Sequence, residues 1–142
     1  MRVGAYKGYV FVVYTRDEHC PPHVHVSGKE WRARFRFSFL DGKVELWDVN
    51  PERRCPTDSV LEELRQALMQ PHFLSRARRI WWESLQTVCL ENNSWDWDAS
   101  EVVPGLVIRP GVHVIASAWH DVAGQRTILN LVRAPDCVGI EL

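Results

Sequence analysis

The sequence predicts an α+β fold: an antiparallel sheet packed on a helical segment, followed by further C-terminal β-strands. Strand patterns fill residues 2–49, one helical block covers residues 57–88, and strand patterns return after it. Strands and helices do not alternate as in βαβ units, so a parallel, doubly wound sheet is not expected. The 142 residues suit one domain, or a small domain with an extension. We therefore expect a sheet-plus-helix region at 1–88 and a β-strand extension at 89–142, which could also pack into the same domain.

The first strand is expected at residues 8–15, where β-branched and aromatic residues dominate. A charged turn leads from it to a segment in which Pro21 and Pro22 hold the chain in an extended or turning conformation. His23 and His25 then alternate with valines, which predicts a strand with both histidines on one face. His19 precedes the prolines and could fold back toward this pair.

The clearest alternation in the chain predicts a strand at residues 31–39. Apolar residues occupy one face (Trp31, Ala33, Phe35, Phe37 and Phe39), and polar residues occupy the other (Arg32, Arg34, Arg36 and Ser38). Asp41-Gly42 predicts a hairpin turn into a strand at 43–49.

The register of the histidine strand depends on the turn before residue 31. A two-residue turn at 27–28 places His25 opposite Glu30 and His23 opposite Arg32. The histidines, Glu30 and the arginines Arg32, Arg34 and Arg36 would then line one solvent-facing polar surface. A slip of one residue would turn the histidines to the other side of the sheet.

Helical periodicity predicts a helix after residue 57, with Thr57 or Asp58 as N-cap, and Pro71 ends it or kinks it into a second. Residues 91–98 are expected as a loop or boundary. Strands are expected at 102–109, 112–120, 127–133 and 138–142, either extending the first sheet or forming a second. The predicted core contains Phe35, Phe37, Leu64, Leu68, Ile80 and Trp81.

Composition excludes some classes of protein. The formal net charge of −1 excludes a globally basic nucleic-acid binder, although not a local basic patch. No apolar run approaches the roughly 18 residues of a membrane helix, and the N-terminus lacks a signal-peptide pattern. We therefore expect a cytoplasmic protein without a membrane partner, whose four widely spaced cysteines are free thiols.

Residues 1 to about 85 resemble a small bacterial family, that of domain of unknown function 4160. The resemblance rests on the tyrosine-rich first strand, the string His19-x-Pro21-Pro22-His23-x-His25, the charged hairpin and the closing helix that ends near Trp81 or Trp82. It implies a small cytosolic bacterial protein, often encoded beside a second small protein in mobile or toxin–antitoxin-like loci. The strands beyond residue 91 depart from that pattern.

Three functions are compatible with the histidine segment. In the first, His19, His23 and His25 bind a transition metal such as zinc, because imidazole is a common ligand for such ions. His23 and His25 could chelate one ion, and His19, Cys20 or the distant His120 could complete the ligand set. The alternative is structural, with imidazole N–H groups bonded to backbone carbonyls in the proline turn.

In the second function, His23 and His25 act as general acid and base in RNA cleavage, and Arg32 and Arg34 hold phosphate. The third is binding without chemistry, in which Arg32, Arg34, Arg36 and Glu30 form a binding surface for RNA or DNA, or for an acidic protein such as a small cognate partner. A solvated basic strand face would show the same alternation. A toxin–antitoxin-like protein acting on RNA is the function we expect first. The sequence leaves open whether the protein is an enzyme, and it is compatible with a homodimer.

Overall fold

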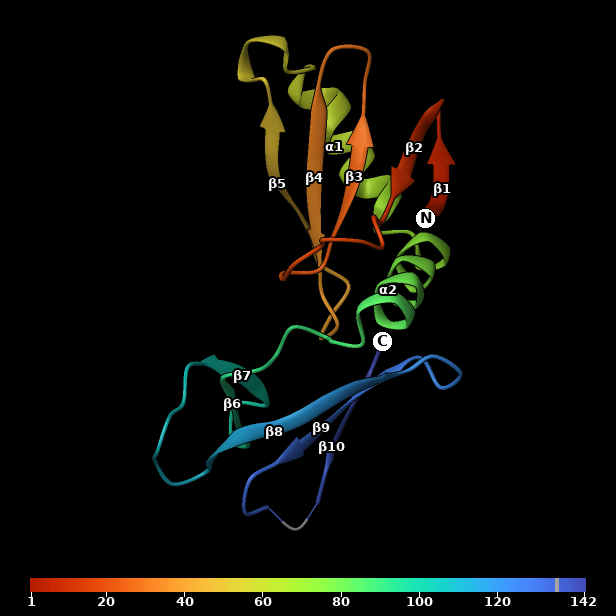
Figure 1. Cartoon of the computed structure of the whole chain (residues 1–142). Helices are drawn as coiled ribbons and strands as arrows, with labels where there is room; N and C mark the ends of the chain where they lie inside the picture. Colours follow the sequence, from red (N-terminus) through yellow and green to blue (C-terminus); the bar gives the residue numbers. More distant parts are fainter. Residues whose placement is uncertain (135) are drawn as a thin grey trace. The chain divides into compact units, whose positions relative to one another are not determined.

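The computed structural model describes residues 1–134 and 136–142 and confirms the α+β fold. The chain forms two compact units, Met1–Gln86 and Thr87–Leu142, each with its own five-stranded antiparallel sheet (Figure 1). The C-terminal strands therefore form a second sheet and do not extend the first.

The sheet of the first unit has the strand order β1-β2-β3-β4-β5, which is also the order along the chain. Neighbouring strands are joined as hairpins or short connections, as is typical of an antiparallel meander. The strands are β1 (Arg2–Tyr6), β2 (Tyr9–Val12), β3 (His23–Ser27), β4 (Arg32–Phe37) and β5 (Val44–Asn50).

Two helices complete this unit after a short 3-10 turn, η1 (Glu52–Arg54). They are α1 (Asp58–Leu68) and α2 (Pro71–Leu85), and Figure 1 shows them packed against the sheet. Thr57 caps α1, since its hydroxyl accepts a hydrogen bond from the backbone N–H of Val60. Pro71 occupies the first turn of α2, where its missing N–H costs no helical hydrogen bond.

Alternation on β4 decides which face the helices cover. Ala33, Phe35 and Phe37 are buried, while Arg34 and Arg36 lie on the opposite face, as the sequence predicts. Every residue of the predicted core is buried: Phe35, Phe37, Leu64, Leu68, Ile80 and Trp81.

The predicted register of β3 against β4 is wrong by four residues. His25 pairs with Arg34 and His23 with Arg36, because residues 28–31 form the turn. The backbone N–H of Gly28 donates to the carbonyl of Trp31, and the indole of Trp31 lies where any Cβ at position 28 would stand. A shift by an even number preserves the faces, so the histidines still share a face with the arginines.

The second unit contains the strands β6 (Asn93–Asp96), β7 (Glu101–Pro104), β8 (Val112–Asp121), β9 (Arg126–Leu131) and β10 (Val138–Glu141). Their order in the sheet is β10-β9-β8-β6-β7. The expected loop at 91–98 is wrong in part, because β6 pairs with both β7 and β8. A small core holds the unit together (Trp95, Ile115, Leu129, Leu131 and Val138).

The structure bears on two expectations that were drawn from composition, one about membrane helices and one about free cysteines. No helix in the described part of the chain is long and apolar enough to cross a membrane. Cys55 and Cys137 are free and exposed, as expected. Neither Cys20 nor Cys89 is a free thiol, so the expectation of four free thiols is wrong for these two.

Candidate metal centre

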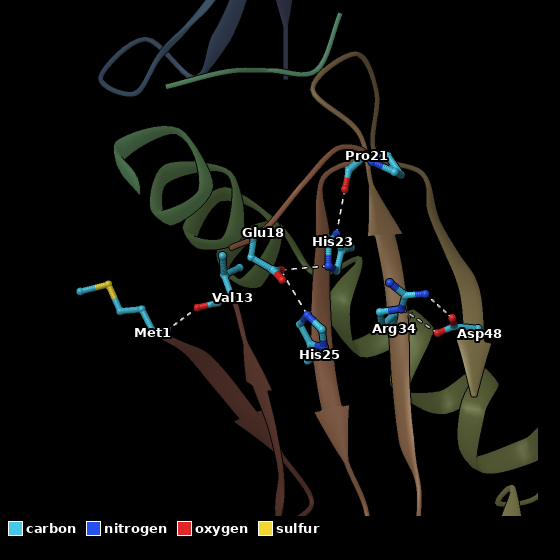
Figure 2. A network of polar contacts seen from close by, with 8 residues as sticks. All are labelled: Met1, Val13, Glu18, Pro21, His23, His25, Arg34 and Asp48. Carbon is cyan, nitrogen blue, oxygen red and sulfur yellow. Dashed lines mark hydrogen bonds and ion pairs between the residues drawn. The ribbon is translucent and has the colours of Figure 1, made fainter. Parts of the chain in front are cut away.

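The segment between β2 and β3 brings a carboxylate to the two histidines of β3. Figure 2 shows Glu18 reaching from this segment toward His23 and His25, which lie two residues apart on one face of the strand. The proline-containing turn at Pro21 reverses the chain between the carboxylate and the histidines. Local sequence therefore places three side chains of ligand type at one end of the sheet.

One oxygen atom of Glu18 lies between the two imidazoles. Glu18 Oε2 is 2.9 Å from His23 Nε2 and 3.1 Å from His25 Nε2, and the three ligand atoms lie within 4.8 Å of one another. Neighbouring ligands of a tetrahedral zinc ion are about 3.3 Å apart, given bonds of about 2.0–2.1 Å. Binding of one ion to all three atoms therefore requires the two Glu18 contacts to open by a few tenths of an ångström. It also requires the two imidazole Nε2 atoms, which lie within 4.8 Å of each other, to approach to about 3.3 Å.

The backbone orients the ring of His23. His23 Nδ1 lies 2.8 Å from the carbonyl oxygen of Pro21, and because a carbonyl only accepts, Nδ1 carries the proton and donates. Burial lowers the pKa of His23, although the Pro21 carbonyl and the Glu18 carboxylate act in the opposite direction. The neutral ring therefore presents the bare lone pair of Nε2 to the site. Metal-ligating histidines are commonly oriented by a hydrogen bond of this kind.

His23 Nε2 is buried and has no hydrogen-bond partner among the described residues. Its close neighbour is an oxygen of Glu18 at 2.9 Å, which is also an acceptor when ionised. Two acceptors this close repel each other, and a buried acceptor without a donor costs about 1–3 kcal/mol. A cation shared by the imidazole and the carboxylate removes both penalties.

Aromatic rings enclose the three ligand side chains. The ring centroid of His23 is 5.1 Å from that of Trp47 and 5.4 Å from that of Trp81, and the ring of Tyr14 lies 4.4 Å from that of His25. The exposed fractions of the side chains are 1% for His23, 9% for Glu18 and 19% for His25. The centre is therefore largely shielded from water, and His25 is its most accessible ligand.

The arginines on this face form ion pairs. Arg34 donates two hydrogen bonds to the carboxylate of Asp48, and its guanidinium lies 4.0 Å from the ring centroid of Trp47 (Figure 2). The Arg34 hydrogen bonds hold the pKa of Asp48 below its ordinary value. Arg36 donates to Glu45 at 2.9 Å. Both cations are thus matched by acids on β5.

The structure brings His23, His25, Arg34 and Arg36 to one face, but not the other predicted site residues. Glu30 lies in the turn and forms an ion pair with Arg54, and Arg32 lies at the far end of β4, opposite Ser27. The ring of His19 lies 6.1 Å from that of His23, and His19 is outside the group of close ligand atoms.

The expectation that both histidines face solvent is wrong for His23, which has no exposed surface. Sequence reasoning also missed Glu18 as a ligand. Its signal is nevertheless local, since a carboxylate stands five and seven residues before two histidines that share a strand face. Carboxylate and imidazole are both common zinc ligands, so this spacing could have indicated the third member of the set.

Comparison with known proteins places this centre inside a recognised domain. Residues 8–54 match the model of a family described as Domain of unknown function (DUF4160). The family expected from the sequence is confirmed for this segment, which contains Glu18, His23, His25, Arg34 and Asp48. No curated protein and no solved structure matches the chain.

Proposed function

We propose that the first unit is a metal-binding domain that holds a divalent transition metal, with zinc as the first candidate, on Glu18, His23 and His25. The observation that carries the proposal is the buried Nε2 of His23, which has no hydrogen-bond donor and faces an oxygen of Glu18 at 2.9 Å. A bound divalent cation accepts a lone pair from each of the two atoms and so satisfies both.

The ligand set favours a working centre over a purely structural one. Structural zinc sites are usually closed by four protein ligands, whereas catalytic sites have three and leave a position for water or substrate. Two imidazoles and one carboxylate are also the ligands of many non-haem iron(II) sites. A metal held in this way would supply Lewis acidity and would lower the pKa of a water molecule toward neutral. In this proposal, the three ligand side chains bind the metal, and the surrounding aromatic rings shield it from water.

Metal titration of the full-length protein after treatment with chelator tests this proposal. We expect about one equivalent of Zn²⁺ to bind by calorimetry, and we expect Glu18→Gln and His25→Ala each to weaken binding at least ~10-fold, the scale of changes near metal centres. His72→Ala is the matched control, because His72 is an exposed histidine on α2 and lies outside the cluster.

Thermal stability gives a second readout of the same site. At a free metal concentration of 100 times Kd, binding adds about 2.7 kcal/mol to the free energy of unfolding. For a unit of this size, this raises Tm by roughly 10–20 °C. At the same metal concentration, a tenfold loss of affinity in Glu18→Gln reduces the added free energy to about 1.4 kcal/mol. The shift in Tm should therefore be about half that of the wild type or less. If Zn²⁺, Fe²⁺, Mn²⁺, Ni²⁺ and Cu²⁺ all bind no better to the wild type than to His25→Ala, the metal proposal is wrong.

A toxin–antitoxin-like role on RNA, in the cytoplasm of a bacterium, is the second candidate. It is favoured by one arrangement on β3 and β4, where His25 pairs with Arg34 and His23 with Arg36. The acids Asp48 and Glu45 already neutralise these two arginines, so phosphate would have to compete with them. This competition is why we rank RNA binding below metal binding.

Salt-dependent binding of a fluorescent single-stranded RNA tests the second candidate. If the arginine face holds phosphate, Arg34→Ala with Arg36→Ala should weaken binding and flatten its dependence on salt. The matched control is Arg76→Ala with Arg79→Ala, which removes two exposed arginines from α2. Absence of binding at low salt, together with normal growth of cells that express the protein, would exclude this function.

A further inference from the structure

The loop between β7 and β8 in the second unit exposes large aliphatic side chains. The exposed fractions are 97% for Ile108 and 63% for Leu106, and Val132, which directly follows β9, is 42% exposed. Scattered exposed aliphatic residues are normal on protein surfaces, but two of these three share one surface hollow. Ile108 and Val132 line the same groove of about 600 Å³.

The floor and the rim of this groove differ in polarity. Val112 is buried and Val114 is half-buried, so the part of the groove that they line, its floor, is apolar. The half-buried His113 also lines the groove, and its Nδ1 lies 3.0 Å from the carbonyl oxygen of Val132. The rim carries Arg109 and Arg133, and none of the described residues that line the groove has a carboxylate. Arg109 already pairs with Asp96 at 3.3 Å, whereas no described residue forms an ion pair with Arg133. The groove therefore combines an apolar floor with a cation that is available to a ligand.

A buried serine fixes the loop that presents these side chains. Ser94 on β6 has no exposed surface, and its hydroxyl donates to the carbonyl of Gly105 at 2.8 Å and accepts from the N–H of Val107 at 3.0 Å. At the other end of the loop, the backbones of Arg109 and Val112 pair in an isolated antiparallel β-bridge. The exposed side chains of Leu106 and Ile108 are thus presented by a fixed backbone, which lowers the entropy cost of binding a partner.

We propose that this groove docks a peptide segment of a partner protein that carries large aliphatic side chains beside carboxylates. The aliphatic side chains fit the floor and Ile108, and the carboxylates complement Arg133 and Arg109. A second copy of this chain fits less well, because a symmetric dimer would bring two basic rims together. The inference uses residues 94–133 alone and does not depend on the metal centre.

Selection of peptides on the full-length protein tests this inference. A library of random 12-residue peptides should yield sequences enriched in Leu, Ile or Val together with Asp or Glu. The probe is then the selected peptide, synthesised with a fluorophore and measured by anisotropy. Its analogue with every Asp and Glu replaced by Asn and Gln should bind more weakly at low salt, because the charge complementarity is lost.

Variants of the protein locate the bound peptide. Ile108→Asp should weaken binding by about tenfold or more, since it places a charge at the centre of an apolar contact, and Arg133→Glu should also weaken it. Ala123→Asp is the control, because this residue is exposed in the turn between β8 and β9. Ser94→Ala should weaken binding without removing any groove side chain.

Three results would overturn the inference. The first is that no peptide is selected, and the second is that Ile108→Asp and the amide analogue bind as tightly as their parents. The third is sedimentation showing a dimer that Ile108→Asp converts to monomer, which would make a second copy of the chain the occupant.

Discussion

At the scale of single residues, burial lowers the pKa of His23 by more than its hydrogen bond to the Pro21 carbonyl raises it. The carbonyl of Pro21 fixes its proton on Nδ1, and burial favours the neutral ring, so Nε2 is left as an acceptor beside Glu18. His25 makes a similar contact to Glu18 but keeps part of its surface in water. The two histidines of one motif therefore differ in what their removal should do to the fold.

We predict that His23→Ala destabilises the metal-free protein more than His25→Ala does. Loss of His23 leaves the Pro21 carbonyl without its donor and opens a space beside Trp47 and Trp81, at a cost of about 1–3 kcal/mol. His25→Ala should cost less than about 1 kcal/mol, since its ring is partly exposed. Urea denaturation in the presence of a chelator measures both changes, and equal losses would contradict this picture of the site.

At the scale of elements, β4 has one face that packs against the helices and one face that borders the candidate metal centre. Its odd-numbered residues are buried against the helices, and its even-numbered arginines stand beside β3 and β5. A β-bulge on β5 makes Trp47 an extra residue between Asp48 and Leu46, which pair with Arg34 and Phe35. The ring of Trp47 lies under the Arg34 guanidinium. The alternation supplies the faces, and the bulge positions one aromatic wall of the site.

We predict that Phe35→Ala lowers the free energy of unfolding by about 3–5 kcal/mol, as large-to-small changes in a core do. Phe35 has no exposed surface and lies at the centre of β4. Leu46→Ala is the matched control, because Leu46 pairs with Phe35 on β5 but is 38% exposed, and should cost about 1 kcal/mol or less. A loss below 1 kcal/mol for Phe35→Ala would place this residue outside the core.

At the scale of the whole molecule, the candidate chemistry and the candidate docking groove lie in different units. The family match at residues 8–54 covers the metal centre within Met1–Gln86, while the groove lies within Thr87–Leu142. Each unit has its own sheet and buried residues. This division allows metal binding and peptide binding to be tested by variants that do not overlap.

The sequence by itself determined the α+β class, the core residues and the common face of His23, His25, Arg34 and Arg36. These features follow from periodicity along a strand or helix, which is a local property and survives a register shift of four residues. The family of residues 8–54 could likewise be inferred from the chain alone.

Only the tertiary structure decided which side chains meet. It set the turn at residues 28–31, buried His23, paired Arg34 with Asp48, and brought Glu18 to the two imidazoles. It also paired β6 with β7 and β8, where a loop was expected. Such contacts depend on the path of loops and on packing between distant segments. The spacing of Glu18, His23 and His25 indicates a ligand set, but it does not fix the distances within that set.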